Sequence, residues 1–177
     1  YSKLIDSGLE RDRIFLTGNP MHDWIITEQC RTNNKAYLNH NFDVSKKIIT
    51  LITCLHAEYD DRGNSQRCYE DYIMKIYKSI DFSKYHLIVK MHPNDSVEPN
   101  IYKNQLVQFK NSYNNIFIVK PDNSVSVYDY ISISDLIISR SSTIMEESLC
   151  LKKKIISFDL FKDGPSNYYN HLNKYSS

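Results

Sequence analysis

The chain has 177 residues, enough for one domain with a sizeable core, and its 22 lysine and arginine residues nearly balance 21 aspartate and glutamate residues. This balance gives neither the basic face of a nucleic-acid-binding protein nor the acidic excess of a disordered chain, so nucleic acid is not an expected partner. The four cysteines lack the spacing of a zinc site or a disulfide scaffold, and no apolar run approaches the roughly 18 residues of a membrane span, which together predict a cytoplasmic protein.

The N-terminal stretch predicts a short helix at 1–7 and a short strand at 13–17. The strand leads into a Thr-Gly-Asn-Pro turn, whose proline is well placed to begin the next helix. Asn19 and Asp23 are polar groups of this connection, and they mark either the rim of a ligand site or an ordinary turn with an acidic residue at the helix start. Because the chain begins at Tyr1, already inside a predicted helix, we expect a fragment of a longer protein.

Two apolar strands follow, and each ends in polar residues. Residues 47–54, KIITLITC, form a nearly continuous β-branched run, typical of a parallel strand buried on both faces, and His56 follows it. A second strand at 85–91 includes Lys90 and leads directly to His92. Ligands bind at the carboxyl ends of strands in open α/β sheets, so both histidines are either site residues or ordinary surface histidines. A buried unpaired charge is costly, so we expect the Lys90 ammonium to reach the strand end or an anion.

The remaining middle of the chain alternates between helix and strand. Helices are predicted at about 66–80, 101–112 and 125–133, and a short strand is predicted at 116–119. Strands that alternate with helices in this way predict an α/β fold, a doubly wound parallel sheet with helices on both faces. In such a sheet the polar residues that follow each strand meet at one edge, which is the requirement for a shared site.

A hydroxyl-rich turn comes between a strand at 136–139 and the next helix. The first N–H groups of a helix are unpaired and lie at the positive end of the helix dipole, so a turn of this kind can hold a phosphate. Its hydroxyls can cap the helix and donate to the same anion. The turn residues are Ser141, Ser142 and Thr143.

Two carboxylates open that helix, and a last strand is predicted at 154–158. A carboxylate one turn into the helix can accept hydrogen bonds from ribose hydroxyls beside the phosphate, as an acidic residue does in dinucleotide folds. Glu146 and Glu147 are the candidates, and we expect the one on the cleft side to be the ligand. The alternative is a plain capping box that binds nothing.

The order of these motifs resembles the C-terminal nucleotide-binding domain of GT-B glycosyltransferases. The motifs are TGNP with a following Asp, LxxxxH after the central strand, KxHPN after the next strand, and SDLIISxSSxxxEE, and the resemblance covers roughly residues 9–159. The chain is most similar to UDP-N-acetylglucosamine 2-epimerase and to the CDP-glycerol glycerophosphotransferases of wall and capsule polymers. It departs from the epimerase pattern at Ala57, in place of arginine, and at Ser141 and Ser142, in place of two glycines. Arg140 stands where the glycerophosphotransferases usually have aspartate.

The resemblance implies a single Rossmann-like domain over 1–177, the C-terminal half of a two-domain protein whose acceptor domain is absent. The implied function is the donor-binding domain of a nucleotide-sugar or nucleotide-polyol dependent glycosyl or phosphotransferase in surface polysaccharide biosynthesis, inactive on its own. The alternatives are an enzyme like UDP-N-acetylglucosamine 2-epimerase and a non-catalytic Rossmann-like binding module.

The resemblance also implies partners and residue roles. The donor is a UDP or CDP conjugate bound as substrate, without cofactor or metal, and the acceptor is a polysaccharide or glycolipid. Localisation is cytoplasmic, with peripheral attachment to the inner membrane face through the absent regions left open. The implied catalytic residues are His56 and His92, and the implied binding residues are Asn19, Asp23, Lys90, Arg140, Ser141, Ser142, Thr143, Glu146 and Glu147.

Overall fold

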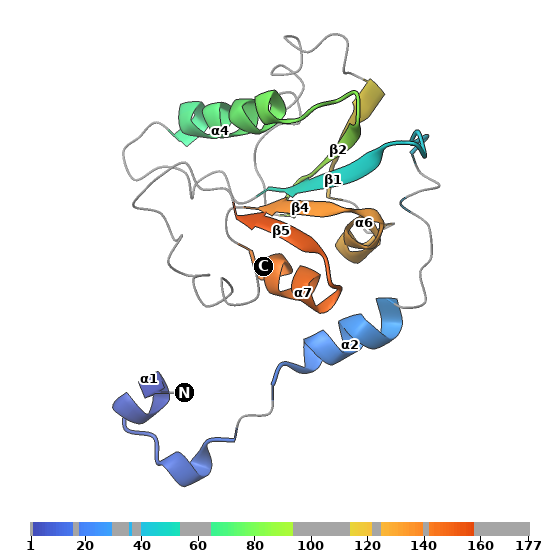
Figure 1. Ribbon diagram of the computed structural model, residues 1–177. Helices are drawn as coiled ribbons and strands as arrows, with labels where there is room; N and C mark the ends of the chain where they lie inside the picture. Colours follow the sequence, from blue (N-terminus) through green and yellow to red (C-terminus); the bar gives the residue numbers. More distant parts are fainter. Residues whose placement is uncertain are drawn as a thin grey trace.

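The computed structural model describes residues 2–15, 18–29, 36, 40–53, 65–93, 114–121, 125–139 and 142–157. Five parallel strands form one sheet in the order β3-β2-β1-β4-β5, so β1 is central and the strand order reverses between β1 and β4 (Figure 1). The strands are β1 (Lys47–Ile52), β2 (Tyr85–Lys90), β3 (Ile116–Val119), β4 (Leu136–Ser139) and β5 (Lys154–Ser157).

Helix α4 covers one face of the sheet, and α6 and α7 cover the other, with α2 packed against α6 and α7 (Figure 1). The predicted doubly wound α/β fold is therefore confirmed. The helices are α1 (Ser2–Asp6), the 3-10 helix η1 (Arg11–Arg13), α2 (Pro20–Gln29), α4 (Ser65–Ser79), α6 (Val127–Ile133) and α7 (Ile144–Cys150).

The strand predicted at 13–17 is wrong for the residues that the structure describes. Arg13 ends the 3-10 helix η1, and Ile14 and Phe15 pair with no strand of the sheet. Their β-branched and aromatic character favours a strand only where a neighbouring strand and a buried face are present. Phe15 is 78% exposed, so neither condition holds here. The helix predicted at 101–112 lies outside the described residues.

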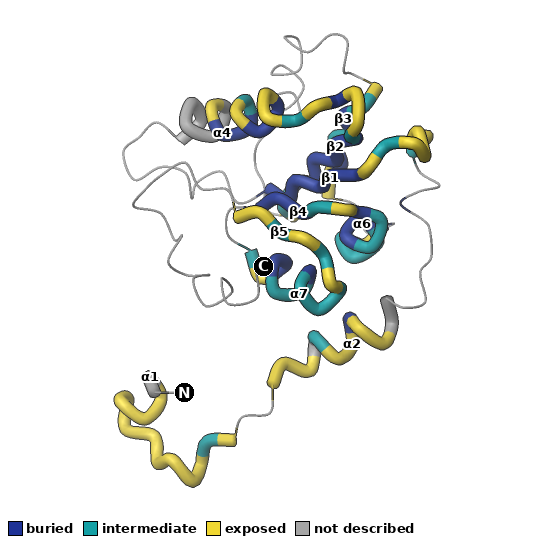
Figure 2. Tube along the Cα trace, in the orientation of Figure 1, coloured by how far each residue is buried: buried dark blue, intermediate teal, exposed yellow. Residues whose placement is uncertain are grey.

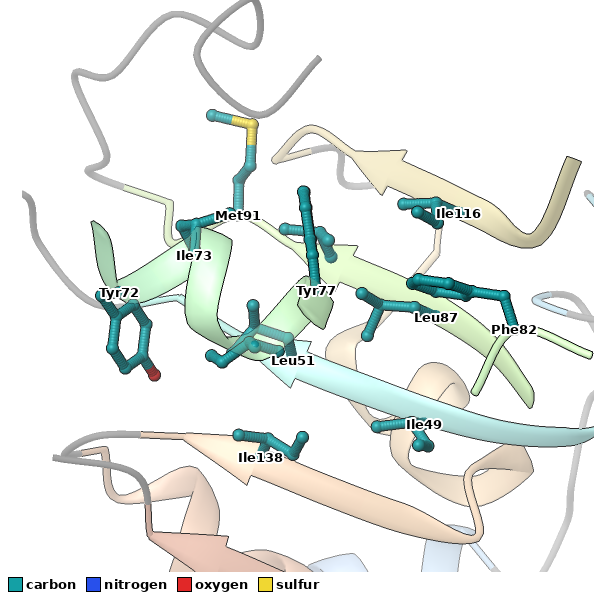
Figure 3. Close-up of a cluster of buried hydrophobic side chains, with 12 residues drawn as sticks. Ile49, Leu51, Tyr72, Ile73, Tyr77, Phe82, Leu87, Met91, Ile116 and Ile138 are labelled. Atoms are coloured by element: carbon teal, nitrogen blue, oxygen red, sulfur yellow. The ribbon is translucent and has the colours of Figure 1, made fainter. Parts of the chain in front are cut away.

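The core under α4 follows from the alternation of side chains along each strand. Ile49 and Leu51 of β1 point toward α4, as do Leu87 and Val89 of β2 (Figure 3). Tyr72, Ile73, Ile76 and Tyr77 of α4 fill the space above them. Burying one such aliphatic side chain stabilises the fold by about 1.5–3 kcal/mol, so this layer fixes the position of the central strands.

The opposite face is held by polar contacts as well as by apolar packing. The carboxylate of Asp135 accepts a hydrogen bond from the Ile48 N–H at 2.9 Å, and the Asp135 N–H donates to the Ile48 carbonyl at 2.8 Å. The ammonium of Lys153 donates to the carbonyls of Ser132 and Ser134, at 2.6 and 3.0 Å. These bonds tie the start of β4 to β1 and the end of α6 to the start of β5, which fixes the helix that borders the site.

The N-terminal elements α1 and η1 lie apart from the sheet and are almost wholly exposed (Figures 1 and 2). Leu4, Ile5 and Leu9 are exposed there, and Trp24 and Ile26 of α2 are also about half exposed. In the described part of the chain, every helix is too short or too polar to cross a bilayer.

A buried histidine near the amino edge of the sheet makes stability depend on pH. The Nε2 atom of His86 accepts a hydrogen bond from the Asp43 N–H at 2.9 Å, so the neutral ring carries its proton on Nδ1. Nδ1 has no partner among the described residues, and the ring lies between Phe42 and Phe117. Burial lowers the pKa of His86 below its usual 6.5, with Asp43 and Lys46 as the nearby charges.

We expect the free energy of unfolding to fall as the pH drops below about 6.5. In this range His86 binds a proton more readily in the unfolded chain than in its buried position in the folded chain. One proton changes stability by at most about 1.4 kcal/mol per pH unit. Urea unfolding at pH 7.5 and 5.5 measures the slope. His86→Gln, which retains an acceptor for the Asp43 N–H, should reduce the slope, whereas His22→Gln on α2 should not. Equal slopes for wild type and His86→Gln would contradict this account.

Candidate functional site

A cavity of about 480 Å³ lies at the carboxyl end of the sheet, beside the point where the strand order reverses. Open α/β sheets bind ligands at this position, because the loops that follow adjacent strands diverge there. Its walls come from the ends of β1 and β2 and from the first residues of α6 and α7. The described lining residues are Ile52, Lys90, Met91, His92, Pro93, Pro121, Val125, Ser126, Val127, Ser142 and Ile144.

Three neighbouring strands, β4, β1 and β2, each contribute one residue to a row at their carboxyl ends. The row lies on the face of the sheet that α6 and α7 cover. Ser139 of β4 and Lys90 of β2 are the register partners of Ile52, one on each side. The hydroxyl of Ser139 is fully buried and has no hydrogen-bond partner among the described residues. The row therefore presents a hydroxyl and a cation on either side of an apolar residue.

Lys90 is only 6% exposed, although it lies at the end of its strand. Its ammonium donates to the Lys120 carbonyl at 3.2 Å and lies 5.9 Å from the centre of the Tyr130 ring. The charge thus reaches the strand end, as the sequence predicts, and lines the cavity. A cation in such a partly desolvated position interacts strongly with an anion that enters beside it.

His92 follows β2 and has a fixed backbone and a half-exposed ring. Its N–H donates to the Thr53 hydroxyl at 2.8 Å, and the preceding Met91 N–H donates to the Val119 carbonyl at 2.9 Å. These bonds hold the end of β2 between the ends of β1 and β3. His92 also lines the cavity.

The N-termini of α6 and α7 both border the cavity. Ser126 and Asp129 form a capping box at the start of α6, which fixes that helix end. At α7 the Ser142 hydroxyl accepts a hydrogen bond from the Ile144 N–H at 3.3 Å. The predicted capping by Thr143 is not observed, because this residue already has helical backbone angles and its side chain makes no capping bond.

The two glutamates of α7 differ in position. Ile144 lines the cavity, and Glu147 lies three residues later, on nearly the same side of the helix, whereas Glu146 lies on the other side. The Oε2 atom of Glu147 is buried and has no hydrogen-bond partner among the described residues. A buried carboxylate oxygen without a donor is costly, so Glu147 has acceptor capacity that the described residues do not use.

The structure brings some of the predicted site residues together and not others. Lys90, His92 and Ser142 line one cavity, with Thr143 and Glu147 beside it on α7. Asn19 and Asp23 are not among the described residues that line this cavity. Asp23 instead lies near Cys150 of α7, where burial, and to a smaller extent the nearby carboxylates including Asp23, raise the pKa of the thiol. The predicted residues outside the described part of the chain are His56, Arg140 and Ser141.

Sequence reasoning placed Ser139 at the start of the hydroxyl-rich turn without giving it a site role, and it missed Ser126. Ser139 ends an apolar strand, and the alternation of β4 could have placed its side chain on the cavity face. Ser126 precedes a helix with Asp three residues later, which is a capping signal. Among the described residues, no group of three or more His, Cys, Asp or Glu side chains could hold a metal ion.

Comparison with known proteins establishes the relationship of this chain. The family model of UDP-N-acetylglucosamine 2-epimerase matches residues 1–159. The chain belongs to this family. The predicted relationship to nucleotide-sugar enzymes is therefore confirmed. No significant match to a curated protein sequence was found.

Solved structures of family members share the fold. A UDP-GlcNAc 2-epimerase from Neisseria meningitidis, bound to UDP-GlcNAc, is 18% identical with a TM-score of 0.59, over 87% of this chain and 40% of that one. The enzyme from Methanocaldococcus jannaschii, in complex with UDP-GlcNAc and UDP, is 22% identical with a TM-score of 0.59, over 96% of this chain and 45% of that one. The chain thus spans less than half the length of these relatives.

Proposed function

We propose that this chain is the nucleotide-binding domain of an epimerase-type enzyme that acts on UDP-N-acetylglucosamine or a closely related nucleotide sugar. The observation that carries the proposal is the cavity at the reversal of strand order, lined by Lys90, His92 and Ser142. Membership of the epimerase family supports the choice of ligand. A volume of about 480 Å³ suits a small-molecule ligand of this size class.

The diphosphate would lie between the end of β2 and the start of α7. The Lys90 ammonium supplies positive charge from one side, and the hydroxyls of Ser142 and Thr143 supply donors from the other. The positive end of the α7 helix dipole lies in the same region. A diphosphate at this position would meet a cation on one side and hydroxyl donors on the other.

The nucleoside would extend along the apolar part of the cavity. Val125 and Val127 provide apolar surface for a base. The Glu147 carboxylate, one turn into α7, would accept hydrogen bonds from the ribose hydroxyls. Of the two glutamates left open by the sequence, the proposal therefore gives this role to Glu147.

The arrangement can stabilise a leaving nucleotide diphosphate. When a sugar-phosphate bond breaks, negative charge develops on the diphosphate, and preorganised donors beside it lower the barrier. The His92 imidazole lines the same cavity and would contact the phosphate or the sugar end. A base that removes a proton from the sugar would come from outside this chain, so the chain alone should bind nucleotide without turnover.

A nucleotide panel tests the proposal. With UDP or UDP-N-acetylglucosamine at about 100 times its Kd, the melting temperature of the chain should rise by roughly 5–10 °C, because the ligand binds only the folded state. GDP should give a smaller shift at the same concentration. Isothermal titration calorimetry then gives the affinities. Absence of any shift with UDP or its conjugates would overturn the proposal.

A transferase remains the second candidate, and the departures from the epimerase pattern at Ala57, Ser141 and Ser142 are the observation that favours it. The same panel separates the two. A shift with CDP or CDP-glycerol, and none with UDP, would assign the chain to a polyol-phosphate transferase that works on a polysaccharide or glycolipid acceptor.

A further inference from the structure

Tyr130 on α6 lies behind the cavity wall, beside the Lys90 ammonium. The tyrosine is 3% exposed, and Lys90 Nζ lies over its ring, 5.9 Å from the ring centre. Val127, one helical turn before Tyr130 and on nearly the same side of α6, lines the cavity, and Lys90 lines it too. Lys90 therefore contacts the tyrosine ring and borders the cavity at the same time.

Hydrogen bonds fix the helix that carries this tyrosine. The Tyr130 carbonyl accepts a bond from the Ser134 hydroxyl at 2.6 Å, and the Ser134 hydroxyl is in turn bonded to the Thr50 hydroxyl of β1 at 2.6 Å. The Ser126 capping box anchors the start of α6. Because β1 pairs with β2, which carries Lys90, these bonds hold the ring at a set distance from the lysine.

The ring of Tyr130 is also held by its neighbours. It belongs to a buried cluster with Phe42 and Val119. Its hydroxyl lies 3.5 Å from the Nε2 atom of His40, and the centres of these two rings are 6.0 Å apart. Close packing of this kind leaves a ring little freedom to turn, so Tyr130 presents its face to Lys90 before any ligand arrives.

The ring and the Lys120 carbonyl hold the Lys90 ammonium without removing its charge. The face of an aromatic ring carries partial negative charge, so it attracts a cation, and the attraction is strongest where both are shielded from water. Lys90 is 6% exposed, and its ammonium also donates to the Lys120 carbonyl at 3.2 Å. The ring and the carbonyl are both neutral groups, so neither cancels the positive charge that a phosphate would meet.

We propose that Tyr130 is a positioning residue that holds the Lys90 ammonium at the cavity for the phosphates of the ligand. This inference rests on the proposed function. A free lysine side chain samples many rotamers, and ordering it on binding would reduce the affinity. With the ring in place, the ammonium is ordered in advance. Tyr130 would therefore strengthen the phosphate-dependent part of the affinity without touching the nucleotide.

The first test compares UDP with uridine in wild type and in Tyr130→Leu. UDP affinity should fall by about three- to tenfold, the value of one cation–π contact shielded from water. Uridine has no phosphates, so its affinity should remain close to that of wild type. Calorimetric titration measures the binding of UDP, and NMR titration measures the weaker binding of uridine. Tyr85→Leu, at the amino end of the strand that carries Lys90, is the matched control and should retain the UDP affinity.

A second test separates the charge of the ring face from the volume of the ring. Tyr130→Phe keeps the ring face and should bind UDP like wild type, although the contact with His40 Nε2 is lost. Pentafluorophenylalanine at position 130 has nearly the same shape but withdraws negative charge from the ring face, so it should lose about three- to tenfold in UDP affinity. These two proteins decide the question if Tyr130→Leu fails to fold.

A double variant shows whether Tyr130 acts through Lys90. In the Lys90→Met background, Tyr130→Leu should cause no further loss of UDP affinity, since interacting residues are non-additive. Additive losses would overturn the inference, as would a folded Tyr130→Leu variant that keeps its UDP affinity or loses uridine affinity equally. Equal UDP affinity of the phenylalanine and pentafluorophenylalanine proteins would overturn it as well. These results would leave the proposed function standing, whereas a wild type that binds no nucleotide would overturn both.

Discussion

Replacing Lys90 with methionine should weaken UDP binding by about 10- to 100-fold, because it removes the buried cation nearest the proposed diphosphate. Methionine fills most of the volume of the lysine stem, so the row at the carboxyl edge should keep its packing. The lost bond to the Lys120 carbonyl should cost little, because Lys120 is exposed and water can replace the donor. Calorimetric titration of UDP into the folded variant gives the affinity.

Lys47→Met is the matched control. Lys47 lies at the exposed amino end of β1, on the opposite edge of the sheet, and the substitution changes the net charge of the chain equally. Its UDP affinity should remain close to that of wild type in the same buffer. A folded Lys90→Met variant with unchanged affinity would show that the diphosphate does not lie at the end of β2.

The largest expected loss of stability comes from Leu51→Ala. Leu51 is fully buried at the centre of the sheet, where Val89 of β2 and Ile138 of β4 are its register partners, and it points toward α4 (Figure 3). Removing a buried leucine side chain costs about 2–5 kcal/mol, from lost transfer energy and the cavity left behind. Urea unfolding followed by circular dichroism measures the change in the free energy of unfolding.

Leu9→Ala makes the same chemical change at an exposed position. Leu9 is 44% exposed and lies between α1 and η1, away from the sheet, so its loss should change stability by less than about 0.5 kcal/mol. Similar losses in both variants would mean that the layer beneath α4 does not hold the central strands in the way the structure indicates.

Much of the fold is predictable from the sequence because its strands carry a strong local signal. The β-branched run of β1 and the apolar run of β4 are buried on both faces, and this burial permits few other residue types. The stretch at 13–17 has the same residue types without a pairing partner in the described part of the chain. Local composition cannot report whether a partner strand exists, so this prediction was wrong.

The candidate site is less predictable, because its residues act in combination. The odd position of Lys90 within an apolar strand was visible in the sequence, and so was the hydroxyl turn before α7. The choice between Glu146 and Glu147 required the orientation of α7 about its own axis, which adjacent positions in a sequence do not reveal.

The central place of β1 has a consequence for the order of folding. β1 pairs with β2, the next strand along the chain, but also with β4, and the bond between Ile48 and Asp135 spans 87 residues. Local contacts form at low entropic cost, whereas closing such a long loop is slow, so β1, β2 and α4 can assemble before β4 arrives. The cavity takes its walls from the ends of β1 and β2 and from the first residues of α6 and α7. Because α7 follows β4 in the chain, the cavity is complete only after this long-range pairing. Nucleotide binding during refolding should accordingly report the last step of assembly, after most of the secondary structure has formed.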